Sequence, residues 1–435
     1  MRLALHWQIA IAIVLAFAIG AFTWTWPEAQ QANALGIFRF IGALFINALK
    51  MLIVPLIVSS IIVGVANIGG GDDVGRLGGK TLLFYWATTL SAILVGLVLV
   101  NIVRPGLSGG EPARDLLDLT VSADEVAAKV GSPGMGDVSE IFLRLIPSNV
   151  IEAAANAQLL GLIFFSLLFG YFMARSDHAY AEPLFRFWNG VFEVMMRMTE
   201  LVMRFAPIGV FGLIAAVVAS QDYSEFERFL GVLLKFAAVV AGALAIHLFV
   251  VLPLFLRFAG RVRAAAMFPA MAPALLTAFS TASSSATLPI TMECVEDNAG
   301  VSKKIASFVL PLGATVNMSG TALYECVAVI FIAQAYGLEL SIYLQFIIVM
   351  TALLTSIGVA GVPSASLVAI VIILQTVGLP AEAIGILFVF DRLLDMARTA
   401  VNIFGDACCA VIVARREGEQ TALGLEQPLS EPSSG

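Results

Sequence analysis

The segment that most constrains the fold is a charged stripe inside an apolar run near the C-terminus. The run covers residues 383–414, which is long enough for a membrane-spanning helix. Its polar residues recur at spacings of four, three, four and four, so they share one face of an α-helix: Asp391, Asp395, Arg398, Asn402 and Asp406. A lone Asp or Arg at mid-bilayer costs roughly 2.5–3.5 kcal/mol, so this face must look into protein.

Two interpretations of the stripe compete. For any single residue, a structural Asp–Arg pair that joins two spans is an equal alternative. No structural pair needs five polar positions, however, so the whole stripe predicts a functional site that holds ions or a solute.

Composition places the chain in a membrane. Of 435 residues, 60% are hydrophobic and 13% are charged, whereas soluble proteins carry about 25% charged residues. The net charge of −7 is spread among loops, and no basic block suggests nucleic acid. The apolar run 9–22 resembles a signal peptide, but tryptophans flank it as they do at membrane interfaces, so we interpret it as the first span.

The remaining apolar segments predict further spans near 35–68, 81–103, 141–174, 183–219 and 229–258. Within them, Pro147, Pro207 and Pro253 are expected to kink or break the helices. Residues 104–138 are polar and predict an extracellular loop, and residues 417–435 predict a disordered tail. Basic residues recur after every second crossing, which places both termini in the cytoplasm.

Two apolar stretches are interrupted by polar or glycine-rich segments. Residues 264–294 are split by a serine run at 280–287, and residues 342–377 are split at 358–366. We expect the halves to be too short to span, which predicts re-entrant helical hairpins. Each is followed by a span with its own polar interruption, an inverted repeat typical of transporter binding sites. The expected fold is an all-α membrane protein with eight transmembrane helices plus two re-entrant hairpins.

The polar groups suit a charged solute and a small cation. Hydroxyls of Ser283–Ser285 and the free N–H groups of a half-helix suit one carboxylate, and Arg398 suits a second. Asp395 can accept from an ammonium group. Carbonyls freed near Asn317 and Gly358–Gly361, with Gly320 expected to relax the helix after Asn317, suit a hard cation that Asp406 helps to neutralise. These groups together describe an acidic amino acid carried with a cation.

Four ordered motifs resemble the glutamate/aspartate–cation symporter family, also called dicarboxylate/amino acid:cation symporters. They are Ser283–Pro289, Leu310–Met318, Gly361–Pro363 and Asp395–Asp406, and the likeness extends over nearly the whole chain. The resemblance implies a homotrimer in the plasma (cell inner) membrane, with a fixed scaffold and a transport part that moves like an elevator. The scaffold would comprise 1–68 and 139–219, and the transport part 76–103, 226–258 and 264–416. It implies Na⁺ (H⁺ is possible) as coupling ion and no cofactor.

The resemblance also implies residue roles. Arg398 would hold the substrate's side-chain carboxylate and Asp395 its amino group. The pocket would be completed by Thr321, Thr399 and Asn402, with the α-carboxylate held by Ser283, Ser284, Ser285 and the Val362 backbone. One sodium would lie at Gly313, Asn317, Asn402 and Asp406. A second would bind carbonyls of Thr315, Ser356, Ile357 and Val359. A third would use Tyr85, Thr88, Thr89, Asn317 and Ser319.

Two departures from the family pattern matter. Ser319 stands where the family usually has Asp, which predicts a weakened third cation site or an altered stoichiometry. An extra arginine common in the family is missing from its usual positions, and Arg392, one helical turn from one of them, is expected to take its place.

Several alternatives remain open at this stage. A C4-dicarboxylate symporter would not need the charge of Asp395, and a neutral amino acid exchanger would not need Arg398. An ion channel needs a continuous pore rather than paired hairpins. An intramembrane enzyme would need Ser283–Ser285 beside His247, although no histidine lies in a polar motif. The sequence decides neither aspartate against glutamate nor sodium against proton.

Overall fold

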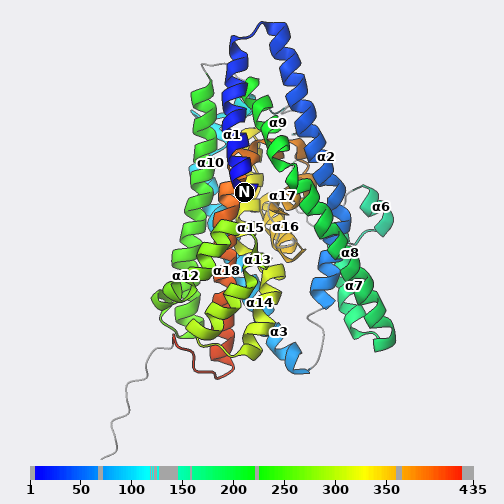
Figure 1. Cartoon of the computed structure of the whole chain (residues 1–435), viewed down its shortest axis with the longest axis vertical. Helices are drawn as coiled ribbons and strands as arrows, with labels where there is room; N and C mark the ends of the chain where they lie inside the picture. Colours follow the sequence, from blue (N-terminus) through cyan, green and yellow to red (C-terminus); the bar gives the residue numbers. More distant parts are fainter. Residues whose placement is uncertain are drawn as a thin grey trace, which may run out of the picture.

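The chain is a multi-pass membrane protein built almost entirely of helices (Figure 1). The computed structural model describes residues 5–66, 72–117, 119, 121, 125–126, 146–156, 159–220, 225–358 and 365–423. By length and composition, seven helices within these ranges can cross a membrane, and up to eight if the bent pair α8 and α9 counts as one span.

The first half of the chain contains long helices and one small sheet. Its helices are α1 (Leu5–Phe22), η1 (Thr23–Thr25), α2 (Glu28–Ala66), α3 (Asp72–Val103), η2 (Asp115–Leu117), α6 (Val150–Ala155), α7 (Leu159–Arg175), α8 (His178–Arg204) and α9 (Ala206–Ala219). Strands β1 (Leu107–Ser108) and β2 (Glu111–Pro112) pair antiparallel, with Leu107 opposite Pro112.

The second half contains shorter helices and several interruptions. It runs through α10 (Phe226–Ile246), η3 (His247–Val251), α11 (Leu252–Phe255), η4 (Leu256–Gly260), α12 (Ala264–Thr281), α13 (Ser284–Glu293), η5 (Cys294–Asn298), α14 (Lys303–Val316), α15 (Ser319–Ala335), α16 (Ile342–Gly358), α17 (Ala365–Thr376), η6 (Ala381–Leu387) and α18 (Phe388–Arg416).

The helices pack in two groups. In the first, α9 lies against α1 and α2, and α2 also packs on α7 and α8. In the second, α15 lies against α3, α16 and α17, while α18 packs on α12 and α14. Figure 1 shows α2, α7 and α8 along one side of the molecule and α15 and α18 nearer its middle. Lys50 of the first group and Glu382 of the second form an ion pair of 3.0 Å.

Prolines and polar residues interrupt the helices where the sequence predicts. Pro207 follows the junction between α8 and α9, whose axes differ by 52°. By contrast, Pro253 lies in the short α11 between two π-helical segments, and the span continues from Phe226 to Gly260, so Pro253 does not break it. The span that carries Asn317 breaks at that residue and at Met318, where the backbone leaves the helical region. Gly320 lies inside α15, so the expectation that it relaxes the helix is wrong.

The first interrupted segment is a helical hairpin. Its turn is formed by Ala282, with a positive φ of 51°, and by Ser283, the N-cap of α13. Asn298 Nδ2 donates to the Ala270 carbonyl at 2.9 Å, so the far end of the hairpin returns to its start. The expectation that both halves are too short to span is wrong for α12, because its 18 residues suffice by length.

Two other expectations need correction. Residues 141–174 do not form one span in the described part: residues 146–149 are non-helical, α6 is short, and α7 follows, while 141–145 and 157–158 lie outside the described residues. The tail is ordered as far as Leu423, because Glu419 binds Ser302 and the Leu423 carbonyl accepts from Arg263 N at 2.9 Å. Residues 424–435 lie outside the described part.

Candidate substrate and cation site

The five stripe residues lie on one helix, α18, as their spacing predicts. All five are buried, with exposed fractions between 0% and 7%, and the helix is enclosed by α12, α14, α15 and α3. The stripe therefore faces protein rather than lipid, because the flanking apolar residues Phe404 and Cys408 are buried as well. A buried helix face can carry this many polar groups only if they meet partners.

Arg398 lies at the centre of the stripe, and only some of its hydrogen-bond donors have partners among the described residues. Its Nη2 donates to Asp391 Oδ1 at 2.9 Å and to Asp395 Oδ1 at 2.8 Å. Its Cζ lies 3.9 Å from the ring centroid of Tyr324 on α15, a cation–π contact. Its Nε and Nη1 are buried and form no hydrogen bond with any described residue. Two strong donors are thus left for a ligand.

Asp395 connects two arginines. One carboxylate oxygen accepts from Arg398, and Oδ2 lies 3.6 Å from Arg392 Nη1. Arg392 is itself buried, and its position beside Asp395 is compatible with the predicted role of a supplementary cation. Thr399, one turn beyond Asp395, donates its hydroxyl to the Asp395 carbonyl at 2.8 Å.

Asn402 connects α18 to α15, which begins just after the break at Asn317 and Met318. Its Oδ1 accepts from Gly320 N at 2.8 Å, which satisfies one of the N–H groups left open at the start of α15. Its Nδ2 donates to the Thr321 hydroxyl at 3.1 Å. A Cβ on Gly320 would lie 3.0 Å from the Arg398 carbonyl, so glycine permits this close approach. The predicted pocket residues Thr321, Thr399 and Asn402 are therefore connected through α18.

The serine run supplies the start of α13, which packs against α18. The Ser283 hydroxyl accepts from Ala286 N at 3.3 Å and so acts as a helix cap. Ser284 is buried and Ser285 is exposed. Val362, the other residue expected at the α-carboxylate, lies outside the described residues.

A second polar cluster lies about two helical turns beyond the arginine, at Asp406. Asn317 Nδ2 donates to Asp406 Oδ1 at 2.8 Å, and the Thr89 hydroxyl donates to Asn317 Oδ1 at 3.3 Å. A Cβ on Gly313 would lie 2.4 Å from Asp406 Oδ1 and 2.5 Å from the Tyr85 hydroxyl, so Gly313 leaves room for both groups. The structure thus brings Gly313, Asn317, Asp406, Tyr85 and Thr89 together around one buried carboxylate.

The structure gives fewer contacts between helices for the other predicted cation ligands. The hydroxyls of Thr88, Thr315 and Ser356 donate to carbonyls of their own helices. Helices α14 and α16, which carry Thr315 and Ser356, are in contact. Ile357 lies in α16, and Val359 lies outside the described residues. Ser319 is fully buried, and its hydroxyl has no hydrogen-bond partner in the described part of the chain.

The donor set suits a hard cation rather than a transition metal. The groups are carboxylate, amide, hydroxyl and carbonyl oxygens, the ligands that small hard cations prefer. Among the described residues, no three His, Cys, Asp or Glu side chains gather as a metal site.

Sequence reasoning missed one buried acid. Glu325 lies on α15, is fully buried, and accepts from the Thr355 hydroxyl of α16 at 2.8 Å through Oε2. Its Oε1 has no hydrogen-bond partner within the described ranges. The signal was present, because Glu325 is the only charged residue between Ser319 and Ala335. Tyr324, which stacks on Arg398, was missed as well.

Comparison with known proteins finds one family over nearly the whole length of the chain. Residues 5–416 match the model of the sodium:dicarboxylate symporter family. The proton/glutamate-aspartate symporter of Escherichia coli K12 is 34% identical, over 96% of this chain and 93% of its own length. The proton/sodium-glutamate symport protein of Geobacillus stearothermophilus is 35% identical, over 96% of each chain. Human excitatory amino acid transporter 3 is 36% identical, over 91% of this chain and 83% of its own.

Proposed function

The chain belongs to the sodium:dicarboxylate symporter family, and from this premise we propose that it is a secondary active symporter that couples uptake of an acidic amino acid to a cation gradient. The observation that carries the choice of substrate is the guanidinium of Arg398. It is fully buried beside Asp395 and keeps two donors without partners among the described residues. A substrate carboxylate can accept charge-assisted hydrogen bonds from these donors.

The amino group of the substrate is proposed to bind Asp395. This carboxylate lies next to the arginine, so the two receptors match a carboxylate and an ammonium group of one small molecule. A C4-dicarboxylate offers no ammonium, and it would leave a buried acid without a cation from the substrate. A neutral amino acid would leave the Arg398 donors unsatisfied. Aspartate and glutamate fit both requirements.

Sodium is proposed as a coupling ion, with Asp406 as its anionic ligand. Asp406 is buried and surrounded by oxygen-bearing groups on three helices, which supports a cation at this place. Because Asn317 touches Asp406 and its neighbours in α15 touch Asn402, an ion here would also order the substrate pocket. The third cation site is proposed to be weakened by Ser319.

Replacing Ser319 with aspartate tests that proposal. The new carboxylate would face the cluster around Asn317, since Ser319 Oγ and Asn317 Nδ2 both lie near Gly405. We expect apparent sodium affinity to rise about tenfold, a net ~1.4 kcal/mol, and the sodium dependence of uptake to steepen. Ser319→Asn, which adds no charge, is the matched control. A parent protein that already couples three sodium ions to each substrate would contradict the proposal.

A proton is proposed as a second coupling ion, carried by Glu325. A buried carboxyl without a cationic partner among the described residues is costly when ionised, so it favours the protonated form when its surroundings close. Its partner Thr355 lies on α16 of the second interrupted segment, so a change in that segment changes the environment of the acid. The proton-coupled names of bacterial relatives support this proposal.

Glu325→Gln should distinguish proton coupling from sodium coupling. Glutamine keeps a hydrogen bond to Thr355 but carries no titratable proton. We expect uptake driven by a pH gradient alone to be lost, whereas exchange of aspartate across the membrane in sodium should persist. Glu293→Gln, on the exposed side of α13, serves as the control. Undiminished proton-driven uptake in the Glu325 variant would rule out this role.

The elevator mechanism, the homotrimer, the plasma-membrane location and the cytoplasmic termini are also proposed. Helices α1, α2, α7, α8 and α9 pack mainly on one another, although α2, α7 and α9 also contact α16, α17 and α18, and this grouping supports a fixed scaffold and a moving transport part. In this view α12–α13 and α16–α17 are the re-entrant hairpins. The Lys50–Glu382 pair joins the two parts in this conformation.

The alternatives from other classes have less support. The enzyme interpretation needs a serine–histidine pair, but both ring nitrogens of the buried His247 have no hydrogen-bond partner in the described ranges. The test of the proposed function is uptake of radiolabelled aspartate and succinate into proteoliposomes, with sodium and proton gradients imposed separately. Aspartate uptake that follows one of these gradients is expected. Succinate uptake without aspartate uptake would contradict it.

A further inference from the structure

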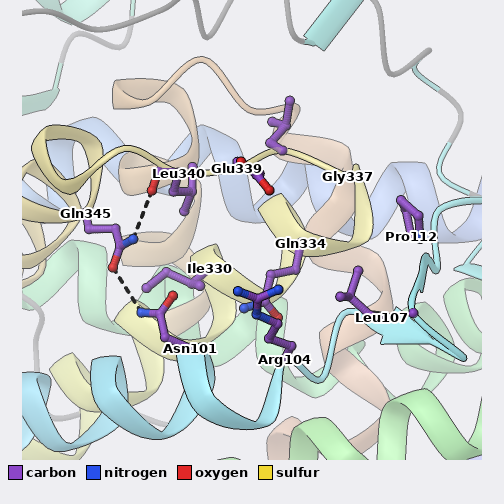
Figure 2. Close-up of a pocket in the computed structure, with 12 residues that line it drawn as sticks. Asn101, Arg104, Leu107, Pro112, Ile330, Gln334, Gly337, Glu339, Leu340 and Gln345 are labelled. Carbon is purple, nitrogen blue, oxygen red and sulfur yellow. Dashed lines mark hydrogen bonds between the residues drawn. The ribbon is translucent and has the colours of Figure 1, made fainter.

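A pocket separate from the charged stripe lies where α3 and α15 end and α16 begins (Figure 2). Its volume is about 440 Å³, within the range of small-molecule sites. The wall is formed by the end of α3, the β1–β2 segment and the loop between α15 and α16. None of the residues assigned above to substrate or cation binding lines it.

The pocket wall is held in place by amide side chains. Gln334 donates to the Val100 carbonyl at 3.0 Å and accepts from Gly106 N at 3.2 Å. Asn101 donates to Gln345 Oε1 at 2.9 Å, and Gln345 donates to the Leu340 carbonyl at 2.9 Å, as the dashed lines in Figure 2 show. These bonds fix three polar side chains from α3, α15 and α16 around one space, so the site is largely preformed.

Two opposite charges face the same pocket without pairing. Arg104, at the end of α3, and Glu339, on the loop after α15, both line it. Neither forms an ion pair or a side-chain hydrogen bond with another residue in the described part of the chain. They are therefore too far apart for a direct bond, yet they belong to one cavity. A ligand that carries both charges can bridge them.

The backbone at Arg104 is unusual for an arginine. Its φ is +47°, in the left-handed region that helix ends usually assign to glycine. Only two other non-glycine residues of the described chain, Arg261 and Ala282, have a positive φ. An arginine that occupies such a position at a cost in backbone energy is consistent with a use for its side chain.

We propose that this pocket is a second binding site for a zwitterionic α-amino acid. The guanidinium of Arg104 binds the α-carboxylate, Glu339 binds the α-ammonium group, and the amides of Asn101, Gln334 and Gln345 surround the side chain. Both charged residues are exposed, so their contacts are weakened by water, and the affinity is in about the millimolar range. The site is independent of the transport function assigned to α18.

Binding is measured by saturation-transfer NMR on the purified full chain that carries Arg398→Ala, which silences the central site. The probes are L-aspartate, L-alanine and succinate. We expect both amino acids to bind and succinate, which has no ammonium group, to bind at least about fivefold more weakly. Succinate that binds as well as alanine would overturn the zwitterion assignment, and absence of amino acid binding would overturn the site.

Two pocket variants in the same background identify the residues. Arg104→Gly suits the backbone and so keeps the helix end while it removes the guanidinium. Glu339→Gln keeps the shape and removes the charge. Each is expected to weaken alanine binding at least about fivefold, whereas Glu111→Gln, on β2 outside the pocket lining, leaves it unchanged. Unchanged alanine binding in a folded Arg104→Gly protein would show that Arg104 serves only the helix end.

Discussion

Replacement of Arg398 by cysteine is expected to abolish aspartate uptake at physiological substrate concentrations. The guanidinium offers two buried donors that have no partner among the residues the structure describes, and a hydrogen bond to a charged group contributes about 1.5–3 kcal/mol. Loss of two such bonds lowers kcat/KM by at least ~100-fold. A pocket with a smaller, uncharged side chain at this position is also expected to admit neutral amino acids. The measurement is uptake of radiolabelled aspartate and serine into proteoliposomes.

This variant needs a control for folding, because Asp391 and Asp395 lose a cationic partner inside the protein. Arg197→Cys makes the same substitution on the exposed side of α8, where the arginine forms a surface pair with Glu193. Both proteins should elute as the parent does in size-exclusion chromatography. Aspartate uptake at the parental rate by the Arg398 variant would remove this residue from the substrate site.

Replacement of Asp406 by asparagine is expected to remove sodium coupling. Asparagine keeps the size of the side chain and one acceptor for Asn317, but it removes the negative charge that faces the cation. Breaking a buried pair of opposite charges costs about 3–5 kcal/mol, so apparent sodium affinity should fall more than ~100-fold. Sodium titration of aspartate uptake measures this, with Asp297→Asn, an exposed acid, as control. Parental sodium dependence would mean that another group holds the ion.

Local periodicity explains what could be predicted from the sequence. The spacing of Asp391, Asp395, Arg398, Asn402 and Asp406 requires only the geometry of one helix, and all five are buried in α18. Breaks at prolines and polar residues are also local. The bend before Pro207 and the interruption at Asn317 were therefore predictable.

Contacts between distant segments explain what could not be predicted. The Tyr324 ring over Arg398 and the Thr355–Glu325 bond depend on how α15 packs against α18 and α16. A polar residue in an apolar run does not reveal its partner. The ordered start of the tail also depends on a distant contact. The polarity of residues 417–423 predicts disorder, but Glu419 is held by Ser302, 117 residues earlier. The prediction that α12 is too short to span was wrong because the helix continues through Ser280 and Thr281, and the turn comes only at Ala282 and Ser283.

The central claim is that the buried stripe binds an acidic amino acid together with its coupling ions. The most direct test is calorimetric measurement of the Kd for L-aspartate on the purified protein at several sodium concentrations and several pH values. The Kd is predicted to fall as sodium or proton concentration rises, because the ions and the substrate share the Asn317–Asn402 connection. An aspartate Kd that is the same at every sodium concentration and every pH would contradict the account.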